Sequence, residues 1–236
     1  MEKESSKKAI IRPARPEDAS VVAQLMYYAN MNYVLVFFGN TKNTIKVLRR
    51  MFSMPCHTTS YTYAFVAEVE GNVVGSFSGF DGKGWRASAH ASWLYGPVWF
   101  AITPLRQLPR MVTAFVDFNR AMLPILDEEY YIEHLAVLPE RRGQGVGTQL
   151  IEFAESQART KWLKRVTLDV EIGNEAARRL YERLGFETIK VVTEPNYCKR
   201  FNVQGSIRMA KPSNPRKRQQ EKSAWARRRE NESNGA

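Results

Sequence analysis

Three glycines, Gly143, Gly145 and Gly147, fall between a strand-like run and a helix-like run of the chain. Glycine lets the backbone come close to a ligand, because no Cβ blocks the approach. The first amide N–H groups of a helix have no intrahelical acceptor, and they carry the positive end of the helix dipole. Together these features predict an anion site suited to a pyrophosphate, with Arg142 adding a positive charge at its rim.

Two other phosphate-binding loops fit this segment poorly. A Rossmann fingerprint would have glycine at position 148, which is Thr148, and it would follow the strand at once, whereas residues 139–142 intervene. A P-loop would end in Gly-Lys-Ser or Gly-Lys-Thr, which the segment lacks. A glycine turn that binds no ligand is the remaining alternative.

The residues around this loop follow the patterns of strands and helices in alternation. The expected strands are residues 10–12, 61–69, 73–80, 130–138, 166–170, 186–192 and 206–209. The expected helices are residues 21–28, 41–52, 146–160 and 174–184. The second and third strands form a hairpin about a Gly/Asn turn. The whole pattern predicts an α/β fold with a mixed central sheet of about six to seven strands flanked by helices.

The chain divides into an N-terminal extension (residues 1–9), one folded domain (10–210) and a basic tail (211–236). Residues 82–127 interrupt the regular pattern before the fourth strand and are expected to form a helical, aromatic-rich insertion. It holds Trp85, Trp93 and Trp99, and residues 105–123 look helical with an interruption at Pro109. The apolar stretch 93–100 is interpreted as core or pocket lining, with a membrane-surface or dimer contact as the alternative.

The composition, with 44% hydrophobic and 25% charged residues, is that of an ordinary globular protein. No apolar run of about 18–20 residues is evident, and neither is a secretory signal, so a cytoplasmic protein without a membrane span is expected. The cysteines Cys56 and Cys198 are expected as free thiols, with a disulfide as the alternative, and the three histidines have no metal-ligand spacing.

The formal net charge is +11, of which the tail carries +5 through eight Lys and Arg against three Glu. A run of this kind is typical of a solvated, disordered tail. It is also able to neutralise phosphates, so weak nucleic-acid contact is a second interpretation.

Two segments carry a resemblance to a known family. Residues 135–147 read Leu-Ala-Val-Leu-Pro-Glu-Arg-Arg-Gly-Gln-Gly-Val-Gly, and residues 174–186 read Asn-Glu-Ala-Ala-Arg-Arg-Leu-Tyr-Glu-Arg-Leu-Gly-Phe. The first resembles the Arg/Gln-x-x-Gly-x-Gly/Ala signature of the GNAT superfamily of acetyl-CoA-dependent N-acetyltransferases. The second resembles the other half of that family's CoA-binding region. The close resemblance covers residues 130–192.

The resemblance implies a role for each matching position. The fourth strand would pair with the pantetheine amides, the loop would hold the pyrophosphate, and the fourth and fifth strands would separate to leave a cleft for the sulfur. Asn174 would contact the cofactor, and Tyr181 would lie near the sulfur as general acid. The implied cofactor-binding residues are Leu135, Ala136, Val137, Arg142, Gly143, Gln144, Gly145, Val146, Gly147, Thr148, Asn174, Ala177 and Tyr181.

Asn174 and Tyr181 also have an interpretation without a ligand. Asn174 is a favourable helix N-cap, and Ala177, Leu180 and Tyr181 form one apolar stripe of the helix that follows. On this interpretation Tyr181 belongs to the core. The glycine loop favours the functional role, and Asn174 is able to serve as both cap and ligand.

An amine acceptor needs a general base, because a lysine-type amine with a pKa of about 10.4 is almost entirely protonated at neutral pH. Glu133, in the fourth strand, is the first candidate. His134 is its neighbour and is expected on the opposite side of the strand. Asp169 lies where ribosomal-protein acetyltransferases carry a glutamate base, but its side chain is shorter. For each of these residues, a polar group hydrogen-bonded at a sheet end is the alternative.

The chemistry predicted is direct transfer of acetyl from acetyl-CoA to a primary amine, in a ternary complex, with a small molecule as the acceptor. A strand N–H near residues 135–137 would stabilise the tetrahedral oxyanion. The alternatives are a protein amine as the acceptor, or a non-catalytic acyl-CoA-binding protein with nucleic-acid contact through its tail. An exposed apolar face on the insertion would indicate a homodimer.

Overall fold

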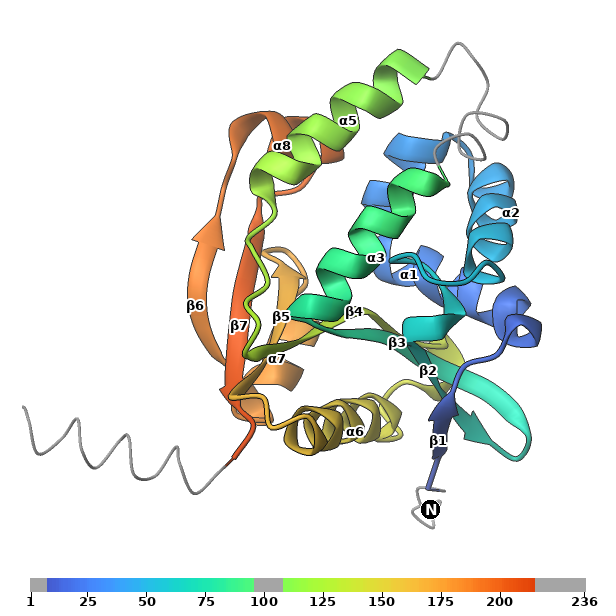
Figure 1. Cartoon of the computed structure of the whole chain (residues 1–236), viewed down its shortest axis with the longest axis vertical. Helices are drawn as coiled ribbons and strands as arrows, with labels where there is room; N and C mark the ends of the chain where they lie inside the picture. The colour runs from blue at the N-terminus through green and yellow to red at the C-terminus, as the bar shows by residue number, and fades with distance from the viewer. Residues whose placement is uncertain (1–7, 96–107, 215–236) are drawn as a thin grey trace, which may run out of the picture.

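A mixed sheet of seven strands forms the centre of the protein in its computed structural model, which describes residues 8–95 and 108–214 (Figure 1). The strand order is β1-β2-β3-β4-β5-β7-β6, and β4 and β5 are parallel while their neighbours pair antiparallel. The strands are β1 Ile10–Pro13, β2 Ala64–Val69, β3 Asn72–Asp81, β4 Glu129–Val137, β5 Arg165–Glu171, β6 Glu187–Val192 and β7 Ser206–Pro212. The predicted α/β fold with a central sheet is confirmed.

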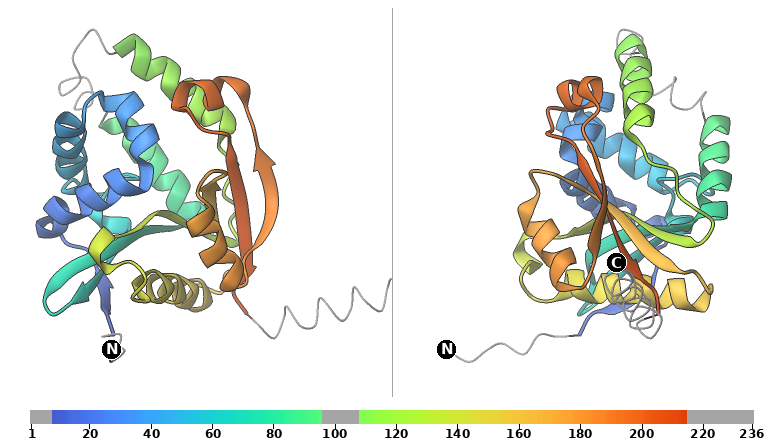
Figure 2. Two further views of the ribbon diagram at one scale, coloured as in Figure 1. Left: turned by 180° about the vertical axis from the view of Figure 1, so that it is seen from behind. Right: turned by 90° about the vertical axis from the view of Figure 1, so that its left-hand side faces the viewer.

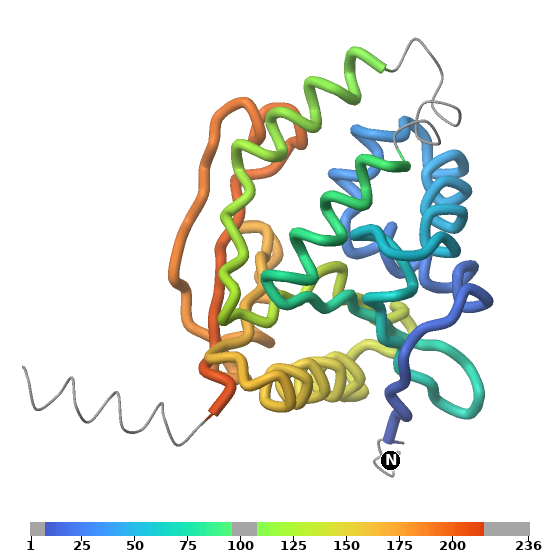
Figure 3. The backbone as a smooth tube through the Cα atoms, in the orientation of Figure 1, coloured from blue at the N-terminus to red at the C-terminus, as the bar shows by residue number. Residues whose placement is uncertain are grey.

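Helices cover both faces of this sheet, with α6 and α7 on one face and α1, α2 and α3 on the other (Figures 1 and 2). Helices α5 and α8 lie side by side beyond the ends of the last strands, although they are far apart in sequence (Figure 3). The helices are α1 Ala19–Phe38, α2 Thr41–Phe52, α3 Gly82–Leu94, α5 Leu108–Ala121, α6 Val146–Thr160, α7 Glu175–Arg183 and α8 Pro195–Phe201.

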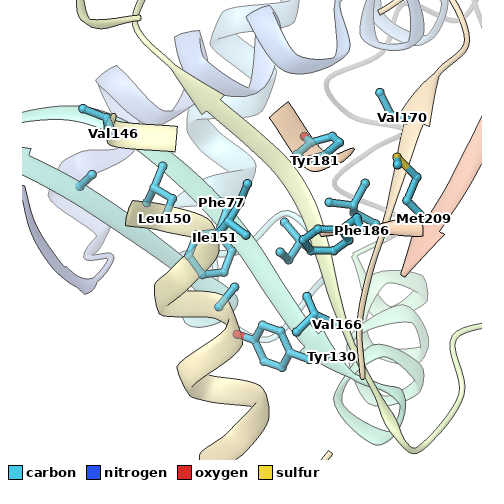
Figure 4. Close-up of a cluster of buried hydrophobic side chains, with 14 of the residues drawn as sticks. Phe77, Tyr130, Val146, Leu150, Ile151, Val166, Val170, Tyr181, Phe186 and Met209 are labelled. Atoms are coloured by element: carbon cyan, nitrogen blue, oxygen red, sulfur yellow. The ribbon is translucent and has the colours of Figure 1, made fainter. Parts of the chain in front are cut away.

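The main hydrophobic core lies between the sheet and α6 (Figure 4). On β5, Val166, Leu168 and Val170 alternate toward it, as the two-residue period of a strand requires. On α6, Leu150 and Ile151 recur at helical spacing with Ala154 and Ala158, and all four are fully buried. Burial of one such Leu or Ile side chain stabilises the fold by about 1.5–3 kcal/mol.

Of the smaller cores on the opposite face of the sheet, two involve helix α1. One joins α1 and α2 to β2 through residues that include Val22, Leu48 and Phe52. The other joins α5 and α8 to the end of α1, with Tyr197 and Phe201 of α8 packed on the ring of Tyr33. The α1 face therefore also holds the aromatic contacts between α5 of the insertion and α8.

The observed bounds of helices and strands agree closely with the predicted bounds where the hydrophobic periodicity is strong. Helices α2 and α6 begin and end where they were predicted, and the strand expected at 61–69 begins at Ala64 after a 3-10 turn. Helix α1 continues well past residue 28 to Phe38, with a non-helical residue at Asn30. Helix α3 lies in the insertion that was expected to be helical, although its bounds were not predicted, and helix α8 was not predicted.

Three expectations about the insertion and the tail need correction. Pro109 lies in the first turn of α5 and does not interrupt it, since the missing N–H costs nothing there. Trp93 and Leu94 are 72% and 73% exposed and line no core, while Trp99 lies outside the described residues. Strand β7 continues to Pro212, and the Ser213 amide donates to the Lys164 carbonyl at 3.0 Å, so the domain extends beyond residue 210.

Helix α1 bears on the expectation about membrane spans without overturning it. With the turn before it, the segment Pro16–Phe38 is long and apolar enough to cross a membrane by length and composition, with a mean hydropathy of 1.3. A buried core helix passes the same test. In the structure this helix contributes Val22, Ala23 and Met26 to the core with α2.

Gly205, just before β7, is expected to tolerate no side chain. Its φ is +131°, and a Cβ there would meet the Val192 carbonyl oxygen at 2.3 Å. We predict that Gly205→Ala lowers the free energy of unfolding by more than about 2 kcal/mol, measured by chemical denaturation. Gly71→Ala is the matched control, because Gly71 has φ +78° with nothing within 4 Å of a Cβ, and only the backbone cost of about 1–2 kcal/mol applies. Equal destabilisation by the two substitutions would contradict the steric argument.

Candidate active site

Strands β4 and β5 part in the middle of the sheet. Their parallel pairing ends at Ile132 and Leu168, although β4 continues to Val137 and β5 to Glu171. The other edge of β4 stays paired with β3 as far as Val137, which lies opposite Gly75. The second half of β4 therefore presents backbone groups on its β5 side that no strand among the described residues takes up.

A bulge at His134 decides which side chains face this opening. Between the pairs Ser78–Glu133 and Ser76–Ala136, β4 contains one more residue than β3, and His134 adopts a left-handed φ of +55°. His134 therefore lies on the α1 side together with Glu133, and not on the opposite side as predicted. The bulge also returns Leu135 to the main core.

Asn30 of α1 is hydrogen-bonded to His134, the residue at the bulge. Its Nδ2 lies 2.6 Å from His134 Nδ1 and 3.4 Å from the Met26 carbonyl oxygen. With the amide as donor to both, Nδ1 of His134 is an acceptor, which assigns the imidazole proton to Nε2. Burial lowers the pKa of His134 to about 4, so the ring is neutral. The non-helical residue of α1 and the left-handed residue of β4 are thus joined by one hydrogen bond.

Glu133 is the most perturbed carboxyl group on this face. Burial, and then the charge of Asp169, raises the pKa of Glu133 to about 8. Its Oε1 lies 3.6 Å from His134 Nε2, and its Oε2 is buried without a hydrogen-bond partner among the described residues. A carboxyl group with a pKa near the working pH and a vacant oxygen is suited to accept a proton.

Both carboxylate oxygens of Asp169, in contrast, already accept hydrogen bonds. It lies opposite Arg208 of β7, whose Nε and Nη2 donate to its two carboxylate oxygens at 2.5 and 2.8 Å. The hydroxyl of Tyr131 donates to Oδ2 at 3.1 Å, and the Arg208 guanidinium lies 5.0 Å from the centre of the Tyr131 ring. Arg208 is buried, so this ion pair is a fixed part of the sheet.

The glycine loop joins the end of β4 to α6. Gly143 and Gly145 have φ of +76° and +81°, and Gly145 is the N-cap of α6. No side chain among the described residues caps this helix, and its first intrahelical bond runs from the Gln149 amide to the Gly145 carbonyl oxygen. The amides of the first turn are therefore left for an anion. Arg142 is anchored through Nε to the Val137 carbonyl oxygen at 3.1 Å.

The residues of α7 lie beside this loop. The Asn174 side chain caps α7 by accepting from the Ala177 amide at 3.2 Å. Leu180 approaches within 3.5 Å of where a Cβ of Gly147 would lie, so α7 packs directly on the first turn of α6. Tyr181 is 7% exposed and lies at the other end of the core from Tyr130, with its ring 5.9 Å from that of Phe186 (Figure 4). Burial raises the pKa of its hydroxyl to about 12.

Several residues of this region were not singled out from the sequence. On the α1 face, the side chains of Ser78, Tyr131 and Arg208 surround Glu133 and Asp169, and Asn32 donates to Glu171 at 3.3 Å. The alternation of β5 places Asp169 and Glu171 on one face, which was a usable signal. The position of Arg208 depends on β7 pairing beside β5, for which the local sequence has no signal.

Metal ligation has no support in the described part of the chain, where no group of three or more His, Cys, Asp or Glu side chains could hold an ion. Cys56 and Cys198 are free thiols. The reactive side chains that gather near the parting are the carboxyl, imidazole, guanidinium and hydroxyl groups of the α1 face, with Tyr181 on the other face.

Known proteins are similar in sequence to part of this chain. An N-alpha-acetyltransferase of Sulfurisphaera tokodaii is 28% identical over 138 residues, which are 58% of this chain and 64% of that protein. N-alpha-acetyltransferase 30 of Schizosaccharomyces pombe is 41% identical over 56 residues, 24% of this chain and 37% of that protein. An aminoalkylphosphonate N-acetyltransferase of Salmonella typhimurium is 39% identical over 56 residues, 24% of this chain and 36% of that protein. The chain spans less than two thirds of each.

Solved structures share the fold over most of the chain. An N-acetyltransferase from Staphylococcus aureus superposes with a TM-score of 0.63 and 24% identity, covering 86% of this chain and all of that one. A second acetyltransferase structure superposes with a TM-score of 0.59 and 19% identity, covering 87% of this chain and all of that one. The family model described as the acetyltransferase (GNAT) family matches residues 40–186, which include both segments that form the loop and α7. The chain belongs to the GNAT acetyltransferase family.

Proposed function

We propose that this protein is an enzyme that transfers acetyl from acetyl-CoA to a primary amine by direct attack in a ternary complex. One observation carries the proposal: the unpartnered carboxylate oxygen of Glu133 lies on β4 where β4 and β5 part, and the glycine loop follows the same strand. A base and an anion site are thus held by one rigid element. Acetyl-CoA carries a pyrophosphate for the anion site and a thioester for the site beside the base.

The residues present fit acetyl-CoA. The uncapped first turn of α6, Val146 to Thr148, together with Gly143 and Gly145, would hold the pyrophosphate through main-chain N–H groups. The open edge of β4 from Leu135 to Val137 would pair with the amides of the pantetheine arm, as a strand pairs with an added strand. Asn174 is already committed as an N-cap, so any contact it makes with the cofactor would be in addition.

The chemistry follows from where these groups lie. The amine nitrogen attacks the thioester carbon, and an N–H of β4 stabilises the oxyanion that forms. Glu133 takes up the proton that the ammonium must lose. Collapse of the intermediate breaks the C–S bond. Tyr181 donates its hydroxyl proton to the leaving thiolate, whose pKa is about 8.5 as for a cysteine thiol, and takes up the second proton that the nitrogen loses as the amide forms. We assign Asp169 no proton transfer, because Arg208 and Tyr131 occupy its oxygens.

The acceptor we propose first is a small primary amine. Helices α5 and α8 pack with the end of α1 on the face where Glu133 lies. Helices that enclose one side of a site suit a small acceptor. A protein α-amine is the second candidate, since two of the relatives are named N-alpha-acetyltransferases. Thiol release with a panel of small amines and a panel of short peptides distinguishes the two. Cytoplasmic location, dimer formation and nucleic-acid contact through the tail stay predictions.

The cofactor site is tested by thermal unfolding with acetyl-CoA, CoA and NADH. Ligand at about 100 times its Kd stabilises the fold by about 2.7 kcal/mol, so acetyl-CoA and CoA should raise the Tm and NADH should not. Gly145→Ala should reduce the rise, because a left-handed alanine distorts the N-cap of α6. Gly71→Ala, with a φ within a few degrees of that of Gly145 and nothing within 4 Å of its Cβ, should keep the full rise. No rise with the unaltered protein would remove the main support for the proposal.

Glu133 is tested through the pH dependence of kcat/KM. Burial raises the pKa of Glu133 to about 8, so the fraction of ionised base increases as the pH rises toward 8 and levels off above it. Glu133→Gln should lower kcat/KM by about 10²–10⁴-fold at high pH. The ratio of wild type to variant cancels the protonation of the amine and should itself rise through about pH 8. Glu152→Gln, an exposed carboxylate of α6, is the control. Full kcat/KM at every pH in Glu133→Gln would exclude this base.

Tyr181 is tested by removing its hydroxyl. Because burial raises its pKa to about 12, Tyr181 keeps its proton over the whole assay range, and the loss in Tyr181→Phe should not vary between about pH 6 and 10. We expect kcat to fall by at least tenfold, as for loss of a general acid. Tyr130→Phe removes a hydroxyl from the other end of the same core and should keep its activity (Figure 4). Equal effects of the two substitutions would indicate a packing role for Tyr181.

A further inference from the structure

A hollow of about 680 Å³ lies between the start of α1 and the last turns of α2, away from the candidate active site. Its α2 side is lined by Lys46, Arg49 and Arg50, and its α1 side includes Glu17 and Ser20. Sites for small molecules have volumes of about 300–1,000 Å³, so this hollow is large enough to hold one. Helices α1 and α2 cover the face of the sheet opposite α6, which the glycine loop precedes (Figures 1 and 2). The hollow is therefore separate from the proposed pyrophosphate site.

The packing of α2 fixes the direction of its basic side chains. Val47 and Met51 are buried in the core that α2 shares with α1, which holds the helix in one orientation. Lys46, Arg49 and Arg50 are exposed on the side that lines the hollow. Side chains three and four residues apart are neighbours on a helix, so Lys46 lies beside both arginines. The three positive charges are thus presented together by one rigid element.

These three cations have no counter-charge in the described part of the chain. Helix α2 has four basic residues and no acidic one. In α7, by contrast, Arg178 forms an ion pair with Glu182 one turn away. No ion pair or side-chain hydrogen bond among the described residues reaches the three cations of the hollow. Like charges at this spacing repel one another and destabilise a helix, and a bound anion would remove that repulsion.

The charge of the hollow is suited to a dianion. The C-terminal end of a helix favours basic residues because of the helix dipole, so Arg49 and Arg50 alone indicate no ligand. Across the hollow, however, lies the positive end of the α1 dipole, and Glu17 is the one acid in the lining. Asp18, the next acid along the chain, is held by Arg12 at 2.8 and 2.9 Å. Three cations against one carboxylate leave a charge of +2, and a phosphate monoester carries about −1.5 to −2 at pH 7.

We propose that this hollow binds a small molecule through a phosphate monoester group. Arg49 and Arg50 donate to the phosphate oxygens, because the planar guanidinium matches phosphate geometry, and Lys46 adds a point charge. The Ser20 hydroxyl, on the opposite side, is exposed and able to donate as well. A phosphorylated protein would bury about 800 Å² of this chain, which a single hollow of this size does not supply. No step of acetyl transfer depends on this site.

The test is a titration with glycerol phosphate at constant ionic strength, followed by the NMR shifts of the backbone amides. The amides of residues 16–20 and 46–54 should shift and saturate with a Kd of about 1 mM or tighter. Arg49→Gln and Arg50→Gln should each raise the Kd by about threefold or more, because a charge-assisted hydrogen bond is lost. Glu17→Gln should lower the Kd, since it removes the one acid of the lining. Lys42→Gln removes an equal charge from an exposed position of α2 outside the hollow, and it should change the Kd by less than about twofold.

Four results would overturn the proposal. Shifts that grow without saturating up to about 20 mM would show that no site exists. Equal weakening by Lys42→Gln and Arg49→Gln would show that the phosphate responds only to total charge. Shifts at residues 143–148 that CoA suppresses, with none at the hollow, would place the phosphate at the glycine loop. A short phosphoserine peptide that binds about tenfold tighter than glycerol phosphate would assign the hollow to a phosphorylated protein. All the variants alter exposed residues, and an unchanged Tm of the free protein confirms that each one folds.

Discussion

Backbone hydrogen bonds join β4 and β5 only as far as Ile132 and Leu168, and the site exists because they stop there. A parallel pair in the middle of a sheet is normally covered on both faces and hydrogen-bonded along its length. Here α6 covers one face and α1 the other, so the parting opens within the body of the protein and not at an edge. The free edge of β4 is thereby shielded from pairing with another chain, which an exposed edge would invite.

Two irregularities beside the parting support one another. The left-handed residue His134 costs about 1–2 kcal/mol in an L-amino acid, and such a conformation persists only where its surroundings fix it. Asn30 supplies that contact from the one non-helical residue inside α1. The bulge and the kink are therefore a pair, and each gives the other a hydrogen-bond partner. Their joint effect is to turn two consecutive side chains, Glu133 and His134, to the same face.

Local sequence patterns account for the glycine loop, for α6 and for the cap at Asn174, because each depends on residues close together in the chain. The side of His134 was predicted wrongly because a bulge is a property of two strands, and nothing in β4 alone marks it. Arg208 was missed for a similar reason, since β7 lies between β5 and β6 in the sheet, an arrangement that β7 alone does not mark. Helix α8 had a readable signal in Glu194 and Pro195, a cap followed by proline in the first turn, which was overlooked.

The strand order also decides how many charges the α1 face can hold. A buried carboxyl group is stable mainly in its protonated form, so Glu133 favours the fold at low pH and loses that contribution as the pH rises through about 8. A second, unpaired carboxylate at Asp169 would push its pKa higher still and leave little base near neutral pH. Strand β7 lies between β5 and β6 and brings Arg208 opposite Asp169, which offsets part of that charge within the sheet. The order of the last three strands thus keeps Glu133 ionisable at a pH where an amine can still be made to react.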